Sequence, residues 1–208
     1  MFKNLFKSDS ALMITMSWIT DSIFLSLFWL LGCFPVVTAG ASFAALYDAA
    51  FRGARRGEKN SWQRFLKVYK DNWKISIGPT LLLIAAVFIL AKALIALWNG
   101  AVAGTVSWMA FSGGAFVGVA VLGILSIMFP MLSRFDNSFA ALVRNTFLLG
   151  FANLPRTIAL GVVNAVTIFL CVRFVIPAFF LPALAALVGS LFIEPMFKPY
   201  MSEEEAAR

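Results

Sequence analysis

The sequence predicts an all-α protein, a polytopic bundle of about five membrane-spanning helices. The 208-residue chain is 61% hydrophobic and only 13% charged, whereas roughly a quarter of a soluble domain is charged. Its apolar residues form runs of about 20, the length with which an α-helix crosses a bilayer core. The basic residues behind the net charge of +7 cluster between these runs, as topology determinants do. We therefore expect an integral membrane protein and no nucleic-acid partner.

We expect one integral membrane domain over residues 1–208. Residues 1–16 are amphipathic and are predicted to lie at the membrane interface. Lys3 and Lys7 precede an apolar run, so this start resembles a signal peptide. Cleavage would export a strongly basic loop, and we therefore expect the segment to be retained. The predicted spans are Ser17–Val37, Ser76–Trp98, Ser107–Met131, Arg156–Ile176 and Pro182–Phe197.

The first span ends at a break in the sequence. Pro35 lacks a backbone donor, Gly40 relaxes the backbone, and Thr38 lies between them. Phe34-Pro35 is followed by SFAAL at Ser42–Leu46, and Phe129-Pro130 by SFAAL at Ser138–Leu142. This echo suggests a tandem parallel repeat of span, surface helix and span. The predicted hinge residues are Pro35, Thr38, Gly40 and Pro130.

The distribution of arginine and lysine predicts the orientation. Residues 52–74 form a basic loop, residues 132–155 a second basic loop, and residues 198–208 a tail with an acidic end. Positive loops face the cytoplasm, so we expect both loops and the C-terminus inside and the N-terminus outside. Glu194 and the acidic tail are expected to be solvated.

Each basic loop carries a predicted surface helix in which aromatic and basic residues alternate at helical spacing. Such a helix can lie on anionic lipid or dock a protein partner. The expected contact residues are Trp62, Arg64, Phe65, Lys67, Tyr69, Lys70, Trp73 and Lys74 in the first helix and Phe139, Leu142, Arg144 and Phe147 in the second.

Ionisable residues inside a membrane are costly and are therefore candidates for function. Asp21, Lys92 and Arg173 fall at similar predicted depth in the outer leaflet, and we expect Asp21 to pair with Lys92, Arg173 or both. The alternatives are a structural ion pair with a snorkelling lysine, or a functional group, either a polar vestibule open to the outside or a contact to a partner. Asn164 is expected to bond between helices, and the GxxxG at Gly114–Gly118 to pack helices within one chain.

Several stretches resemble the YesL family, small bacterial membrane proteins classed as a domain of unknown function. They are Phe28-Trp29-Leu30-Leu31, Pro35-Val36-Val37-Thr38-Ala39-Gly40, Ala45-Leu46-Tyr47, Phe65, Arg144-Asn145-Thr146-Phe147 and Asn153-Leu154-Pro155-Arg156-Thr157. Ser26 departs from the family, in which many members carry Asn. The resemblance implies about five spans, a location in the bacterial inner membrane and a genomic association with carbohydrate ABC importers and glycan-degrading enzymes.

The sequence contains no histidine, no phosphate-binding loop and no metal-ligand spacing, so we expect neither an enzyme nor a cofactor. The leading hypothesis is an accessory or regulatory subunit that associates with the permeases of a carbohydrate ABC importer, in contact with membrane lipids. The sugar link comes from the resemblance. The alternatives are a small autonomous, homodimeric solute transporter and a membrane adaptor without a transport role.

Overall fold

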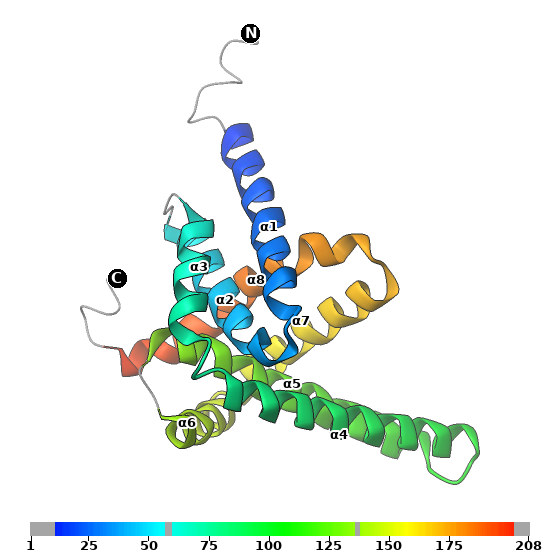
Figure 1. The fold of residues 1–208 in the computed structure, drawn as a ribbon. Helices are drawn as coiled ribbons and strands as arrows, with labels where there is room; N and C mark the ends of the chain where they lie inside the picture. Colours follow the sequence, from blue (N-terminus) through cyan, green and yellow to red (C-terminus); the bar gives the residue numbers. More distant parts are fainter. Residues whose placement is uncertain (1–10, 57–59, 136–137, 202–208) are drawn as a thin grey trace.

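The computed structural model describes residues 11–56, 60–135 and 138–201, and this part of the chain is helical with no strand (Figure 1). The all-α bundle is confirmed. The α-helices are α1 (Ala11–Cys33), α2 (Ala39–Arg56), α3 (Ser61–Asn72), α4 (Ile77–Val102), α5 (Trp108–Arg134), α6 (Phe139–Ala152), α7 (Leu154–Arg173) and α8 (Leu181–Phe197). The 3-10 turns are η2 (Val36–Thr38), η3 (Ile176–Phe179) and η4 (Lys198–Tyr200).

Four helices in the described part are long and apolar enough to cross a membrane, namely α4, α5, α7 and α8 with its extension to Tyr200. They correspond to the second to fifth predicted spans. Figure 1 shows α4 and α5 running side by side as a long hairpin. The first predicted span falls mainly on α1, a helix of 23 residues, within which Thr20–Cys33 is apolar. The protein is therefore a polytopic membrane protein.

Parts of four predicted segments lie outside the described residues. These are residues 1–10 of the interfacial segment, residues 57–59 of the first basic loop, residues 136–137 of the second basic loop, and residues 202–208 of the tail. Within the described part, residues 11–16 belong to α1 and residues 198–200 form η4.

The predicted break between the first two helices is present. Pro35 adopts an extended conformation, with φ −77° and ψ 102°. The Thr38 hydroxyl lies 3.1 Å from the carbonyl oxygen of Gly32 and 2.9 Å from that of Pro35, so its single proton can be donated to either of them. The Gly32 carbonyl is one of the acceptors left free at the end of α1. Gly40 donates its N–H to Thr80 Oγ1 at 3.0 Å, and a Cβ there would lie 2.4 Å from that oxygen. Only glycine permits this close approach to α4.

Helix α2 is the centre of the bundle. Its small residues Ala41, Ala44, Ala45 and Ala49 are fully buried, and it packs against α1, α3, α5 and α8. Alanine leaves little side chain between helix backbones, so several helices can approach α2 closely. Both hydrophobic clusters of the described core include residues of α2.

The second tight contact joins α5 and α7. A Cβ on Gly123 would lie 2.0 Å from the carbonyl oxygen of Thr157, and one on Gly161 would lie 2.0 Å from that of Val119. Gly114 and Gly118, the predicted GxxxG pair, face leucines of α4. Leu97 lies beside Gly114, and Leu90 and Leu94 lie beside Gly118. That pair therefore packs α5 on α4 within the same chain.

The two SFAAL copies occupy matching places but different surroundings. Each lies in a shorter helix, α2 or α6, that follows a long one. Ser42 is buried, whereas Ser138 is exposed and caps α6 by accepting from the N–H of Ala141 at 3.4 Å. Pro130 lies inside α5, which continues to Arg134, so no break occurs there. The first copy is therefore part of the core and not a surface helix.

Candidate functional site: a buried charge network beside an apolar cavity

A buried carboxylate lies at the point where α2, α3 and α5 meet. The Asp48 side chain is 0% exposed. Its Oδ1 accepts from Nε of Arg52, one turn further along α2, at 3.1 Å, and its Oδ2 accepts from Nε of Arg64 on α3 at 2.5 Å. Nε of Arg134, at the end of α5, is 4.0 Å from Oδ1. This last separation is too long for a hydrogen bond and makes the contact purely electrostatic.

A second carboxylate extends the network to α8. Glu194 Oε1 accepts from Arg134 at 2.8 Å and from the Tyr47 hydroxyl at 2.9 Å. The Arg134 guanidinium also lies 4.6 Å from the centre of the Phe51 ring, a cation–π distance. Glu194, expected from the sequence to be solvated, is thus a partly buried member of the network. Glu194 lies in the last turn of α8, which is packed into the core, as the burial of its neighbours Ile193 and Met196 shows.

Tyr47 acts as a donor in this network. Burial of the phenol, reinforced by the charge and hydrogen bond of Glu194, raises the pKa of Tyr47 well above its usual range. The hydroxyl therefore stays protonated at neutral pH and can donate to the carboxylate. Together the three arginines, two carboxylates and one phenol tie α2, α3, α5 and α8 to one another.

The network has the chemistry of a structural clamp. Each carboxylate is engaged by guanidinium groups, and a buried ion pair of this kind fixes helix positions more than it offers a reactive group. Within the described residues no three His, Cys, Asp or Glu side chains are grouped to hold a metal ion. We find no arrangement of nucleophile and base there.

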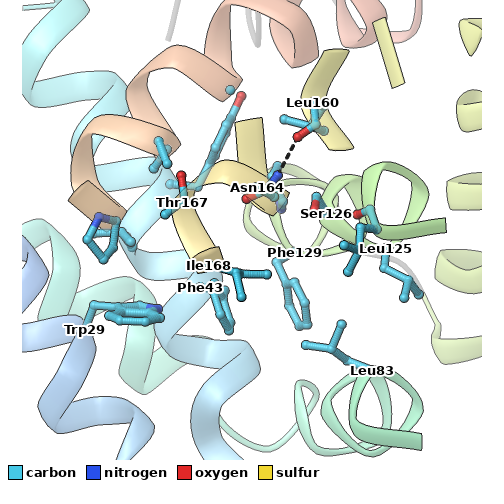
Figure 2. A pocket seen from close by; sticks show the side chains of 18 of the residues that line it. Trp29, Phe43, Leu83, Leu125, Ser126, Phe129, Leu160, Asn164, Thr167 and Ile168 are labelled. Carbon is cyan, nitrogen blue, oxygen red and sulfur yellow. Dashed lines mark hydrogen bonds between the residues drawn. The ribbon is translucent and has the colours of Figure 1, made fainter. Parts of the chain in front are cut away.

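Beside the network lies an apolar cavity of about 300 Å³ (Figure 2). Residues of α1, α2, α4, α5, α7 and α8 line it, and none of them is charged. The ring of Tyr47 forms part of the wall, so this one residue belongs both to the cavity and to the charge network. Such a cavity suits an uncharged, mostly apolar ligand.

The polar groups of the cavity wall come mainly from two helices. They are Ser126 on α5 and Asn164 and Thr167 on α7, and Figure 2 shows Asn164 between the other two. Each side chain donates a hydrogen bond to a backbone carbonyl of its own helix. Ser126 donates to Leu122 at 2.6 Å, Thr167 to Val163 at 2.8 Å, and the Asn164 amide to Leu160 at 2.9 Å. The expected bond of Asn164 to another helix is therefore not formed by its amide nitrogen.

The predicted intramembrane charge cluster is not assembled. Within the described residues no ion pair joins Asp21 to Lys92 or Arg173. Lys92 lies over the ring of Phe88 on its own helix, at 5.6 Å, and Arg173 lies over the neighbouring Phe174, at 5.5 Å. All three are exposed on the surface of the bundle, where long basic side chains can reach the membrane interface.

The predicted contact residues divide between surface and core. Phe65 and Leu142 are buried, Tyr69 stacks on Phe65, and Arg64 turns inward to Asp48. The remaining predicted contacts are exposed: Trp62, Lys67, Lys70, Trp73 and Lys74 on α3 and the turn after it, and Phe139, Arg144 and Phe147 on α6. One side of α3 is therefore fixed to the bundle while its basic aromatic side faces outward.

Sequence reasoning missed Asp48, Arg134 and Tyr47. A signal was present, because Asp48 interrupts an alanine-rich helix and Arg52 follows four residues later, the spacing of a helical ion pair. Ser26, the departure from the family pattern, also has a role. It is fully buried, and its hydroxyl accepts the N–H of Ala183 in the first turn of α8 at 3.2 Å, a group with no partner inside that helix.

Comparison with known proteins gives one family. Residues 22–93 match the model of a family described as "Protein of unknown function, DUF624". The matched stretch runs from α1 into α4 and includes Asp48, Arg52 and Arg64, but neither Arg134 nor Glu194. No curated protein and no solved structure matches the chain. The first half of the charge network thus lies in a segment that is similar to a family of proteins of unknown function.

Proposed function

We propose that the chain is an accessory or regulatory membrane subunit that associates with the permeases of a carbohydrate ABC importer. The observation that supports association is the way in which one side of α3 is fixed to the bundle while the other side is exposed. Arg64 is held by Asp48, and Phe65 is buried in the core, so the inner side of this short helix is fixed. Trp62, Lys67, Lys70 and Trp73 remain exposed on its other side.

This outward side has the composition of a contact surface. Tryptophan is among the residues that contribute most to protein interfaces, and the lysines beside it add positive charge that an acidic partner surface would complement. The same residues attract anionic headgroups, so the surface suits a partner's loop close to the membrane. The sugar importer as partner comes from the resemblance to YesL proteins. The bacterial inner membrane, with α3 at its cytoplasmic face, follows from that resemblance and from the charge distribution.

The cavity gives no support to autonomous transport of a sugar. A hydrophilic solute needs a continuous set of hydrogen-bonding groups through the bundle. The cavity wall is instead apolar, with its polar side chains gathered mainly on α5 and α7. The described structure therefore favours the subunit hypothesis over the transporter.

The test is a pull-down of the protein from native membranes at native expression, in a mild detergent, analysed by mass spectrometry and native gel. We expect sugar-importer permeases at fixed stoichiometry. The variant Trp62→Ala/Trp73→Ala should lose them while retaining its fold. Its matched control is Trp98→Ala/Trp108→Ala, which removes two equally exposed tryptophans at the far end of the α4–α5 hairpin (Figure 1).

Recovery of the wild-type protein alone, as a discrete homo-oligomer, would refute the proposal and direct attention to transport. Equal recovery of permeases by both double variants would refute the part played by α3. Loss of permeases from the control as well would show that aromatic anchoring in lipid, and not the α3 surface, governs recovery.

A further inference from the structure

The cavity between α4, α5 and α7 is open toward the membrane. Val87 of α4 and Ile168 of α7 line it, and both are also exposed on the outside of the bundle, at 41% and 51%. Both helices pack on α5 rather than on one another. In a bilayer this opening faces hydrocarbon, since α4 and α7 are long apolar spans. An occupant can therefore enter from the lipid phase.

Within the described residues, the polar groups of the wall leave both acceptors and donors without partners. Ser126, Thr167 and one N–H of the Asn164 amide already donate to carbonyls of their own helices, and the Tyr47 hydroxyl donates to Glu194. The carboxamide oxygen of Asn164 has no donor among the described residues. The indole N–H of Trp29 is buried in the wall and has no acceptor within the same part of the chain. A polar group without a partner is costly in an apolar site, and a hydroxyl group can donate to such an acceptor or accept from such a donor.

From this complementarity we propose that the cavity binds a lipid-soluble alcohol, that is, an uncharged hydrocarbon or isoprenoid chain bearing a hydroxyl group that donates to Asn164 Oδ1. The apolar wall excludes a charged headgroup, because no lining residue carries a compensating charge. The volume of about 300 Å³ is at the small end of ligand sites and fits a single chain. Isoprenoid alcohols and monoacylglycerols, each with one chain, share this chemistry.

The test uses bromoundecanol, whose bromine quenches a tryptophan that it contacts. Trp29 lines the cavity, and subtracting the signal of a Trp29→Phe variant isolates its fluorescence. The full-length protein is held in nanodiscs and titrated with the alcohol and with its methyl ether, which has the same chain but no donor. Each probe partitions into the bilayer to the same extent with every variant. This contribution therefore cancels when the apparent affinities of two variants for one probe are divided.

We expect saturable quenching of Trp29, with the alcohol binding about fivefold more tightly than the ether, the factor given by one hydrogen bond of about 1 kcal/mol. Asn164→Leu should remove this preference and bind both probes alike. Equal binding of alcohol and ether by the wild type, or an unchanged preference in Asn164→Leu, would overturn the assignment of Asn164.

A matched pair of variants on α8 tests the location. Ala185 lines the cavity, whereas its neighbour Leu184 does not and is exposed. Ala185→Phe should abolish the saturable component and Leu184→Phe should preserve it. Saturable quenching that survives Ala185→Phe, or that is absent from the wild type, would overturn the proposal.

Competition identifies the source of the alcohol. Farnesol and monooleoylglycerol are each added to the bromoundecanol complex, and recovery of Trp29 fluorescence is measured. Displacement by farnesol supports an isoprenoid ligand, and displacement by monooleoylglycerol supports a glycerolipid. Displacement by neither overturns the proposal. Because no permease takes part, failure here leaves the pull-down result of the proposed function unaffected.

Discussion

Replacing the buried carboxylate tests the charge network most directly. Asp48→Asn keeps the size of the side chain and removes its charge. Two charge-assisted hydrogen bonds are weakened, those from Arg52 at 3.1 Å and Arg64 at 2.5 Å, and the electrostatic contact with Arg134 at 4.0 Å is lost. Removing one partner from a buried ion pair typically costs about 3–5 kcal/mol.

The surroundings place Asp48→Asn near the lower end of that range. Arg64 is 30% exposed and Arg52 15%, so both guanidinium groups can turn toward water once the carboxylate is gone. The Arg134 side chain is only 4% exposed and cannot turn toward water, but it keeps its ion pair with Glu194 at 2.8 Å. We therefore expect a loss of about 3 kcal/mol in the free energy of unfolding.

The measurement is reversible unfolding in mixed micelles, followed by tryptophan fluorescence as the fraction of denaturing detergent rises. The matched control is Asp71→Asn, which removes an exposed carboxylate near the end of α3, and should change stability by less than about 0.5 kcal/mol. A loss in Asp48→Asn no larger than that in the control would refute the reasoning. The double variant Asp48→Asn/Arg64→Gln should be less than additive, because the two residues share one contact.

Three other substitutions test single contacts. Gly123→Ala places a Cβ 2.0 Å from the Thr157 carbonyl and should cost about 1–3 kcal/mol by forcing α5 and α7 apart, whereas Gly113→Ala on the same helix meets nothing within 4 Å and should be neutral in the same unfolding assay. Ser26→Ala leaves the buried N–H of Ala183 without an acceptor and should lower the free energy of unfolding by about 1–3 kcal/mol. Ser26→Thr, which retains the hydroxyl, should recover part of this stability. Burial and Glu194 raise the pKa of Tyr47, so its contribution to folding is fully present below about pH 10 and lost as pH rises through the folded-state value. The difference in absorbance titration between wild type and Tyr47→Phe should show a phenol that ionises only above the usual range, and ionisation in the usual range would contradict the buried hydrogen bond.

The spans could be predicted from the sequence because hydropathy depends on composition alone. The break at Pro35 was also predictable, since proline and glycine act on their own backbone. The charge pairs were not. The similar predicted depth of Asp21, Lys92 and Arg173 in the membrane suggested that they would meet. Pairing also depends on how each helix is rotated about its axis, and all three side chains face outward.

The glycines show the same limit. The predicted contact of Gly114 and Gly118 within one chain was correct, because α4 and α5 are joined by a short turn and must lie together. The closer contact of Gly123 with Thr157 was not predicted, because it depends on where α5 crosses α7. Asp48 was overlooked for a related reason. The predicted spans leave residues 38–75 outside the membrane bundle, whereas α2 packs on α1, α3, α5 and α8 and also contacts α4.

The break at Pro35 explains how Asp48 comes to be buried at all. Had α1 continued in a straight line beyond Cys33, Asp48 would lie about 22 Å further along the helix axis, at about 1.5 Å per residue. It would then be beyond the reach of the other spans. The extended Pro35 and the turn η2 instead bring α2 back against α1 and into contact with α5 and α8. One end of the Tyr47 side chain then lines the cavity while its hydroxyl reaches Glu194, and Asp48 meets Arg64 and holds α3. The position of the outward side of α3 and the shape of the cavity thus both depend on this single turn of the chain.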